Sequence, residues 1–456
     1  MATARVAPGA PRLATSLPKV LLIQPTQYAP GGGLCKQRRI YLPGLAFPLL
    51  AALTPEDWEV EIRLEVIDDI DLDTDADLVG IGTMGHAAFR GLDLAREFKA
   101  RGKPVFMGGY MASMVVDEAL KTVDSVVKGD AELGYPKLLR DFQERGRIEP
   151  VYDLPIEDLN GLPVPRYEVL TRRPIGNMLP VMAGRGCPHL CSFCSIACIY
   201  QGRYLTRALD EVLRDIEAVR ALGFRRFYLI DDNIVGNPGF LEQLARELEP
   251  MKMRWSSQCS LQLARNPRLL ELVARSGCEI LSFGLESITQ EGLDGINKPW
   301  VKVDEHEELL GRIRAAGIMA SSEMMVGLDS DTEETIEATH AFIQRARIPI
   351  PRFYILTPMP GSELYDEYRR EGRLLTEDFI KYDGTTCVHR PALLAPERLT
   401  ELYWWLNRQT FSLGSILRRT LLNPSLWRRP ALMLFALGVN LHYRRYVRRG
   451  VTPNIF

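Results

Sequence analysis

The chain has 456 residues, of which 46% are hydrophobic and 25% are charged, and its formal net charge is -2. This length suggests two or three domains, and the composition is that of an average globular protein. A net charge near zero gives no overall attraction to nucleic acid, so no nucleic-acid partner is expected. The eight cysteines are too few and too unevenly spaced for a disulfide-rich secreted protein, which favours a reducing cytoplasm.

The two ends of the chain carry no predicted membrane or export signal. Residues 1–17 are predicted to be a disordered tail, because they lack the continuous apolar run of a signal peptide. The longest late apolar segment, PALMLFALGVNLHY, is shorter than the roughly 20 residues that a membrane-spanning helix needs. We therefore predict no membrane span.

Residues 18–147 contain short β-branched apolar runs, such as KVLLIQ and DLVGIG, that alternate with amphipathic helical runs. This alternation is typical of a parallel sheet covered on both faces, and it predicts an α/β Rossmann-like domain. Such domains bind ligands at the carboxyl ends of their strands, here the loops 83–86 and 108–111. A G-x-G-x-x-G motif is absent, so a dinucleotide is not the expected ligand.

A second α/β region is predicted further along the chain. Residues 148–178 contain several prolines and little periodicity, which predicts a linker. From residue 179 to residue 390, six strand-like runs are separated by helical runs, and parallel strands need crossovers of this kind. We therefore predict a partial (βα)6 barrel, with its functional residues where the carboxyl ends of the strands meet.

Four cysteines, Cys187, Cys191, Cys194 and Cys198, lie within twelve positions just after the first strand of this barrel. Zinc sites usually draw ligands from two separated pairs, whereas no second pair follows the C-x3-C-x2-C spacing here. An iron–sulfur cluster bound by three thiolates leaves one iron open to another ligand. The spacing therefore favours a cluster, with Phe193 shielding its edge.

Residues 391–456 are predicted to form a helical, basic C-terminal region. No acidic residue follows Glu401, whereas nine arginines do, namely Arg408, Arg418, Arg419, Arg428, Arg429, Arg444, Arg445, Arg448 and Arg449. Two interpretations stay open: a basic face that is simply exposed to water, or a docking surface for an acidic electron carrier.

The cysteine motif Cys187-x3-Cys191-x2-Cys194 at the end of the first strand of a six-fold βα barrel resembles the radical S-adenosylmethionine (SAM) superfamily. The resemblance implies that these cysteines hold a [4Fe-4S] cluster, which binds SAM and cleaves it to a 5′-deoxyadenosyl radical. It also implies an electron donor such as a flavodoxin or ferredoxin system, and a partner dehydrogenase is a further expectation. Cys198 lies outside the motif and is interpreted as a buried thiol, or else as part of a second site.

Three further segments match the superfamily by their position after later strands of the barrel. LIDDN follows the second strand, FGLES follows the fourth and TPMPG follows the sixth. The resemblance implies that residues of these segments contact SAM, namely Asp231, Asp232, Asn233, Glu286, Ser287 and Pro358. Acidic residues at strand ends are also common helix caps, so each match alone is weak.

The first domain, with GGY after its fourth strand and GDAELGYPKLL later, resembles the cobalamin-binding (B12-binding) domain of B12-dependent radical enzymes. The D-x-H-x-x-G motif that supplies a cobalt ligand in some of these domains is absent. Met111 stands where relatives commonly have the histidine of GG-x-H, and the nearby His86 is interpreted as a capping or surface residue. Cobalamin is therefore uncertain, and an empty scaffold is the slightly favoured interpretation.

The fifth barrel strand contains a carboxylate, Glu323, in the segment IMASSEMMVGL. Alternation places Ser321, Glu323 and Met325 on one face. If that face is the inner one, Glu323 is a buried charge with no basic neighbour identified in the sequence, and an amine substrate would pair with it. The alternative is that Glu323 faces a helix and caps it.

The main function hypothesis is radical dehydration of a hydroxyl-rich amino sugar, as in the cobalamin-free type of enzyme that deoxygenates paromamine in the biosynthesis of the aminoglycoside antibiotic apramycin. Glu323 or Asp232 would bind the ammonium group or move a proton, and Tyr204 or Tyr228 would relay a hydrogen atom. The alternative is cobalamin-dependent methylation of an unactivated carbon. A non-enzymatic iron–sulfur sensor fits less well, because a regulator has no need of an acid-lined barrel mouth.

Overall fold

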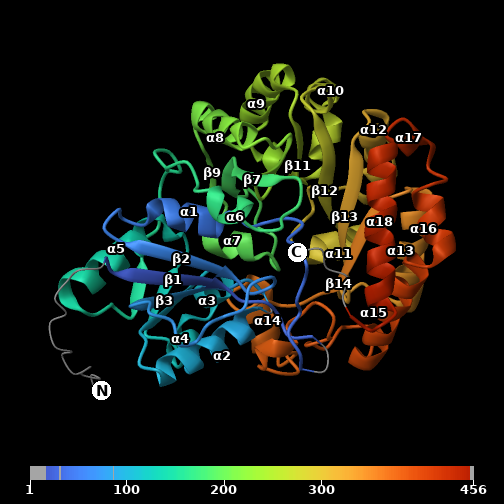
Figure 1. Cartoon of the computed structure of the whole chain (residues 1–456). Coiled ribbons are helices and arrows are strands. Elements are labelled where there is room, and N and C mark those ends of the chain that lie inside the picture. The colour runs from blue at the N-terminus through green and yellow to red at the C-terminus, as the bar shows by residue number, and fades with distance from the viewer. Residues whose placement is uncertain (1–16, 30–31, 86, 452–456) are drawn as a thin grey trace.

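The computed structural model describes residues 17–29, 32–85 and 87–451. The predicted tail therefore lies outside the described residues except for Leu17, and so does His86. Two six-stranded parallel sheets form the framework, and Figure 1 shows the first at the blue end of the chain and the second running from green to orange. This arrangement, with a helical C-terminal region, confirms the predicted α/β fold class.

The first sheet has the order β2-β1-β3-β4-β5-β6. Its strands are β1 (Lys19–Gln24), β2 (Glu59–Leu64), β3 (Leu78–Gly82), β4 (Val105–Gly108), β5 (Ser125–Lys128) and β6 (Val151–Asp153). The helices of this half are α1 (Ala46–Leu53), α2 (Ala87–Ala100), α3 (Tyr110–Met114), α4 (Val116–Leu120), α5 (Ala131–Arg145) and α6 (Glu168–Thr171). Strand β6 and helix α6 fall in the segment predicted as a linker, and β6 pairs in parallel with β5.

Alternation along β1 explains why this sheet is covered on both faces. Val20 and Leu22 pack with residues of α1 and α5, whereas Leu21 and Ile23 pack with residues of α2 on the opposite face. All four side chains are buried, as expected for the centre of a doubly covered parallel sheet.

The second sheet has the order β14-β13-β12-β11-β10-β7, so all six predicted barrel strands pair in chain order. These strands are β7 (Leu179–Met182), β10 (Arg226–Ile230), β11 (Arg254–Cys259), β12 (Cys278–Glu286), β13 (Met319–Val326) and β14 (Ile350–Ile355). A short hairpin, β8 (Gly184–Gly186) with β9 (Tyr204–Thr206), follows β7. Its loop carries the cysteine motif.

Helices connect the strands of the second sheet. They are α7 (Ser195–Tyr200), α8 (Leu209–Ala221), α9 (Pro238–Met251), α10 (Pro267–Arg275), α11 (Gln290–Gly295), α12 (His306–Ala315), α13 (Glu333–Arg345) and α14 (Glu363–Arg370), with single 3-10 turns at 234–236, 261–265, 303–305 and 379–381. Several begin where the sequence supplies a cap: Asn237 accepts a hydrogen bond from the backbone N–H of Phe240, and Pro238 opens α9.

The C-terminal helices cover the outer strand of the barrel sheet, on the side away from the N-terminal domain (Figure 1). They are α15 (Pro396–Thr410), α16 (Leu413–Arg419), α17 (Pro424–Trp427) and α18 (Pro430–Val447). Both α15 and α18 contact β14, which protects that edge from pairing with another strand. Over the described ranges, every helix is too short or too polar to cross a bilayer.

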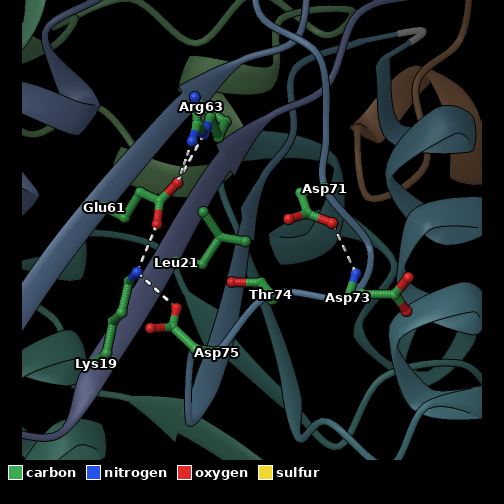
Figure 2. Close-up of a pocket in the computed structure, with 8 residues that line it drawn as sticks. All are labelled: Lys19, Leu21, Glu61, Arg63, Asp71, Asp73, Thr74 and Asp75. Carbon is green, nitrogen blue, oxygen red and sulfur yellow. Dashed lines mark hydrogen bonds and ion pairs between the residues drawn. The ribbon is translucent and has the colours of Figure 1, made fainter.

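A cavity of about 350 Å³ is lined by residues of β1 and β2 and of the segment before β3, and none of the predicted site residues lines it (Figure 2). Lys19 at its wall pairs with Glu61 and Asp75, at 2.8 and 2.7 Å. Ligands of parallel α/β sheets bind at the carboxyl ends of the strands, so the functional site is expected there and not at the end of β1 where Lys19 lies.

Candidate active site

The cysteine loop leaves the barrel at the hairpin of β8 and β9. Gly186, directly before Cys187, has a φ of +86°, and a Cβ atom there would lie 2.1 Å from the carbonyl oxygen of Arg203. Only glycine fits such a position without moving the backbone. The tight hairpin thus presents the three motif cysteines at the carboxyl end of β7.

The three motif thiols lie close together and are largely withdrawn from solvent. Burial is the main cause that raises the pKa of each thiol, to about 12 for Cys191, and Cys187 and Cys194 raise it further. A [4Fe-4S] cluster binds its thiolates on different irons, and three thiols carried by one loop are a donor set that fits it.

Cys198 makes its own hydrogen bond one helical turn after Cys194. It lies on α7, and its thiol donates to the carbonyl oxygen of Cys194 at 3.3 Å, one helical turn earlier. All eight cysteines are free. The Cys198 thiol therefore has a hydrogen-bond partner at the start of its own helix.

The cysteine loop is held in place by the segment after α11. The ring of His189 stacks on Trp300, with ring centres 3.6 Å apart. The side chain of Asn297 donates to the carbonyl oxygen of Leu190 at 2.6 Å. The backbone N–H of Ser192 donates to the carbonyl oxygen of Ile296 at 3.1 Å, so the loop is held on both sides of Cys191.

Asp231, directly after β10, has a protein donor on each oxygen of its carboxylate. Its carboxylate accepts hydrogen bonds from the hydroxyl of Tyr204 and from the backbone N–H of Asn233, both at 2.8 Å. Burial raises the pKa of Asp231 to about 7. The structure brings Asp231 and Tyr204 together, and the hydroxyl of Tyr204 is bonded to the carboxylate of Asp231.

Asp232 and Asn233 lie closer to the cysteines. The carboxylate of Asp232 accepts a hydrogen bond from the backbone N–H of Gly186 at 2.7 Å, and burial raises its pKa to about 6. The side-chain nitrogen of Asn233 lies 3.9 Å from the sulfur of Cys187. Its side-chain oxygen accepts from the backbone N–H of Ser260 at 3.0 Å. Asn233 therefore joins the ends of β10 and β11 to the cysteine loop.

Glu286, at the end of β12, is paired with a lysine that the sequence did not reveal. The ammonium group of Lys298 donates to Glu286 at 2.9 Å and to the carbonyl oxygen of Gly284 at 2.8 Å. Lys298 is 6% exposed, so this is a buried charge pair. Its positive charge also lowers the pKa of the Cys191 thiol, although burial outweighs it.

The other predicted SAM contacts have mainly local partners in the structure. The hydroxyl of Ser287 accepts a hydrogen bond from the backbone N–H of Thr289 at 3.1 Å, a turn at the start of α11. Pro358 is buried after β14. Phe193 packs against an apolar cluster that includes Leu328 and Leu356, which follow β13 and β14.

Glu323 has a basic partner, so the expectation of an unpaired carboxylate was wrong. The guanidinium group of Arg352, its register neighbour on β14, donates to Glu323, and the hydroxyl of Ser282 on β12 donates at 3.0 Å. Both partners belong to adjacent strands, so Glu323 is part of a polar row across the sheet. Tyr228 of β10 and Tyr354 of β14 lie in the electrostatic range of the same pair.

The N-terminal domain contacts the hairpin next to the cysteines through a buried charge cluster. Arg185 of β8 donates to Asp130 and to Glu132, each at 2.6 Å, and Tyr200 donates to Asp130 at 2.8 Å. Asp130 and Glu132 belong to the GDAE segment that follows β5. The carboxyl end of β5 therefore touches the start of the cysteine loop.

Tyr110, after β4, makes a second contact between the two halves. Cys194, Cys198 and Asp232 all lie close enough to raise the pKa of its hydroxyl, although burial is the main cause. The hydroxyl is buried and has no hydrogen-bond partner among the described residues. The carboxyl edge of the first sheet thus faces the cysteine loop of the second.

The same edge of the first sheet carries exposed apolar side chains. In the loops after β1 and β3, Tyr41 is 58% and Met84 is 76% exposed. Gly109 has a φ of +92°, and a Cβ atom there would lie 2.5 Å from the carbonyl oxygen of Thr83, so these loops pack tightly. Met111 is 4% exposed and is turned into the core. Met111 therefore leaves this edge without the side chain that stands in the place of the histidine of GG-x-H.

Sequence reasoning missed Arg185, Lys298 and Arg352, which give charge partners to Asp130, Glu286 and Glu323. The nearest available signal was the position of two of them: Arg185 lies two residues before the first cysteine, and Arg352 is the third residue of β14. The partners of Arg185 and Arg352 lie 55 and 29 residues away, so only domain docking and strand register identify these two pairs.

Comparison with known proteins gives a family match and relatives that align over most of their length. Residues 181–343 match the radical SAM superfamily. The chain is 29% identical over 388 residues to bacteriochlorophyllide d C-12(1)-methyltransferase of Chlorobaculum tepidum, covering 83% of this chain and 82% of the relative. It is also 29% identical over 405 residues to bacteriochlorophyllide d C-8(2)-methyltransferase of the same organism, covering 83% and 88%.

A solved structure has the same fold. The radical SAM methyltransferase TsrM from Kitasatospora setae, with cobalamin and a [4Fe-4S] cluster bound, aligns with a TM-score of 0.65 and 19% identity, over 86% of this chain and 81% of that one.

Proposed function

We propose that the chain is a radical SAM enzyme with a [4Fe-4S] cluster and SAM as cofactors, and that it is a cobalamin-dependent methyltransferase acting on carbon. The observation that carries this proposal is the placement of the two sheets. Arg185 and Tyr110 bring the carboxyl edge of the first sheet against the cysteine loop. A ligand on each edge would therefore lie next to the other.

The predicted site residues keep their roles as proposals within this function. We propose that Cys187, Cys191 and Cys194 hold the cluster and that Phe193 covers its edge. Asp232, Asn233, Glu286, Ser287 and Pro358 are proposed to surround SAM. Because Tyr204 and Asp231 bond to each other, we assign them to positioning the loop that contains Asp232 and Asn233. Bound together, the cluster, SAM and cobalamin supply the electron and the methyl group.

The main hypothesis of amino-sugar deoxygenation has less support than methylation. Its structural premise was an unpaired Glu323 that attracts an ammonium group, and Arg352 already neutralises that carboxylate. The similar proteins above are methyltransferases, and an antibiotic pathway has no support from them. We also propose a cobalamin-binding first domain in place of the empty scaffold, because the strand ends of that domain contact the start of the cysteine loop and the similar TsrM structure has cobalamin bound.

The proposed chemistry implies a compartment, an electron donor and a class of substrate. We propose a reducing cytoplasm as the compartment, where all the cysteines stay available as thiols. A flavodoxin or ferredoxin system is the proposed electron donor. The substrate is a small molecule, and a partner dehydrogenase remains a proposal without structural support.

Cobalamin uptake tests the proposal directly. After anaerobic purification and reconstitution with iron, sulfide and hydroxocobalamin, we expect stoichiometric cobalt and transfer of labelled methyl from SAM to cobalamin. Gly109→Ala should reduce cobalt uptake, because its Cβ would strike Thr83. Gly102→Ala is the matched control, since Gly102 also has a positive φ but open space around it. Deoxyadenosine release by a protein that takes up no cobalt would refute the methyltransferase.

Replacing Glu323 tests the polar row across the barrel. Glu323→Gln leaves the largely buried Arg352 without its anion, and we expect methyl transfer to substrate to fall while iron and cobalt content stay normal.

Loss of one member of a buried pair also costs about 3–5 kcal/mol of unfolding free energy, less the part screened by solvent. The double variant Glu323→Gln with Arg352→Gln should recover stability. Full substrate turnover by Glu323→Gln would remove Glu323 from the site.

A further inference from the structure

Helix α18 is apolar on two opposite faces, which is unusual for a helix on the surface. One face packs into the protein through Leu432, Ala436, Val439, Tyr443 and Val447. The opposite face follows the same helical spacing and is exposed, with Leu434 at 61%, Phe435 at 42% and Leu441 at 44%. A helix that is apolar all round is normally covered on both sides. The outer face of α18 therefore needs a partner.

The neighbouring helices extend this feature. Both α16 and α17 contact α18, and they expose Leu417 at 40% and Trp427 at 60%. The indole nitrogen of Trp427 donates to the carbonyl oxygen of Leu421 at 2.8 Å, so the ring is held in a defined outward position. Exposed large apolar side chains are thus concentrated on the three C-terminal helices.

Basic residues accompany these apolar side chains. On α18 the exposed face ends in Arg445, and Arg448 and Arg449 follow at once, all exposed. Arg418 and Arg428 lie beside Leu417 and Trp427 and are exposed as well. Within the described residues, no carboxylate forms an ion pair with any of these five arginines. The chain after Glu401 contains no acidic residue.

The charge pattern decides between possible partners. A second copy of this chain would bring the same arginines and no carboxylate from this region. An acidic electron carrier would satisfy the arginines but leave Leu434, Phe435 and Leu441 facing a polar surface. A bilayer with anionic lipids satisfies both, because Leu, Phe and Trp enter the acyl boundary while arginine binds the headgroups.

We propose that the outer face of α18, with the adjoining parts of α16 and α17, binds peripherally to an anionic lipid bilayer. In this proposal α18, with its 18 residues, lies in the plane of the interface between lipid and water. No described helix is long and apolar enough to span a membrane. This surface lies on the far side of the barrel from the N-terminal domain (Figure 1), so binding leaves the facing edges of the two sheets free.

Vesicle flotation of the full-length chain tests the proposal. We expect binding to vesicles of phosphatidylcholine with phosphatidylglycerol, weaker binding to phosphatidylcholine alone, and release as salt rises. Leu434→Glu with Phe435→Glu should weaken binding by at least about tenfold, because two charges enter the acyl boundary. Leu222→Glu, at a residue 45% exposed at the end of α8, is the matched control and should bind normally.

A second variant separates the possible partners. Arg445→Gln, Arg448→Gln and Arg449→Gln together should remove the preference for phosphatidylglycerol while thermal unfolding stays unchanged. The proposal is overturned if the wild-type chain ignores both kinds of vesicle at low salt. If the arginine variant instead slows reduction by flavodoxin while no vesicle binding occurs, the surface belongs to the electron carrier. Self-association that Leu434→Glu with Phe435→Glu abolishes, again without vesicle binding, would assign it to a second copy.

Discussion

Cys191→Ala is expected to abolish cluster binding and SAM cleavage, with iron reduced to background and no 5′-deoxyadenosine formed on addition of dithionite. Cys191 is 8% exposed and lies at the centre of the loop held by His189 and Asn297. Two remaining thiolates cannot hold the cluster with one iron open. Iron and sulfide analysis with the visible spectrum of the reconstituted protein measures the loss.

Cys198→Ala is the matched control for this result. Its thiol lies outside the C-x3-C-x2-C motif and donates to the backbone carbonyl oxygen of Cys194. We expect normal iron content and normal SAM cleavage. Equal loss of iron in the two variants would make Cys198 a ligand and would contradict the assignment of three cysteines.

Arg185→Met is expected to loosen the N-terminal domain from the cysteine loop. The variant leaves Asp130 and Glu132 as buried carboxylates without their cation, and their side chains are 12% and 5% exposed. Breaking a buried pair in this way costs about 3–5 kcal/mol of unfolding free energy. We expect a lower urea midpoint and reduced cobalt uptake, because the facing edges are no longer held together.

Arg275→Met provides the comparison for Arg185→Met. Arg275 also bridges two carboxylates, those of Glu249 and Glu271, both at 3.0 Å, but its side chain is 49% exposed. Exposed pairs contribute about 0–1 kcal/mol. A shift of the urea midpoint as small for Arg185→Met as for Arg275→Met would show that the charge cluster does not join the two halves.

Much of the fold could be predicted because each element depends on nearby residues. The alternation of β-branched strands and amphipathic helices predicted both parallel sheets, and all six barrel strands pair in chain order. The linker was less predictable. Val151–Asp153 has too few residues to show a periodicity, and it becomes a strand because β5 offers an open edge.

The candidate site, too, could be predicted from the sequence only where it depends on residues that are near one another in the chain. The spacing of Cys187, Cys191 and Cys194 is local, and the strand-and-hairpin context confines all three to one loop. The expectation about Glu323 failed because its partner Arg352 lies 29 residues away and becomes a neighbour only through the register of β13 and β14. Alternation predicts which face a side chain shares, but it does not predict what the next strand places beside it.

The sequence by itself determined the cluster chemistry and the two α/β halves, since both rest on short-range spacing. Tertiary structure decided what the halves do together. Arg185 meets Asp130 across 55 residues, and Tyr110 meets the cysteine loop only after the two sheets dock edge to edge. Docking depends on the burial of charges and apolar side chains that no local pattern records. That contact is the physical reason for preferring a cobalamin-dependent methyltransferase to an enzyme with an empty first domain.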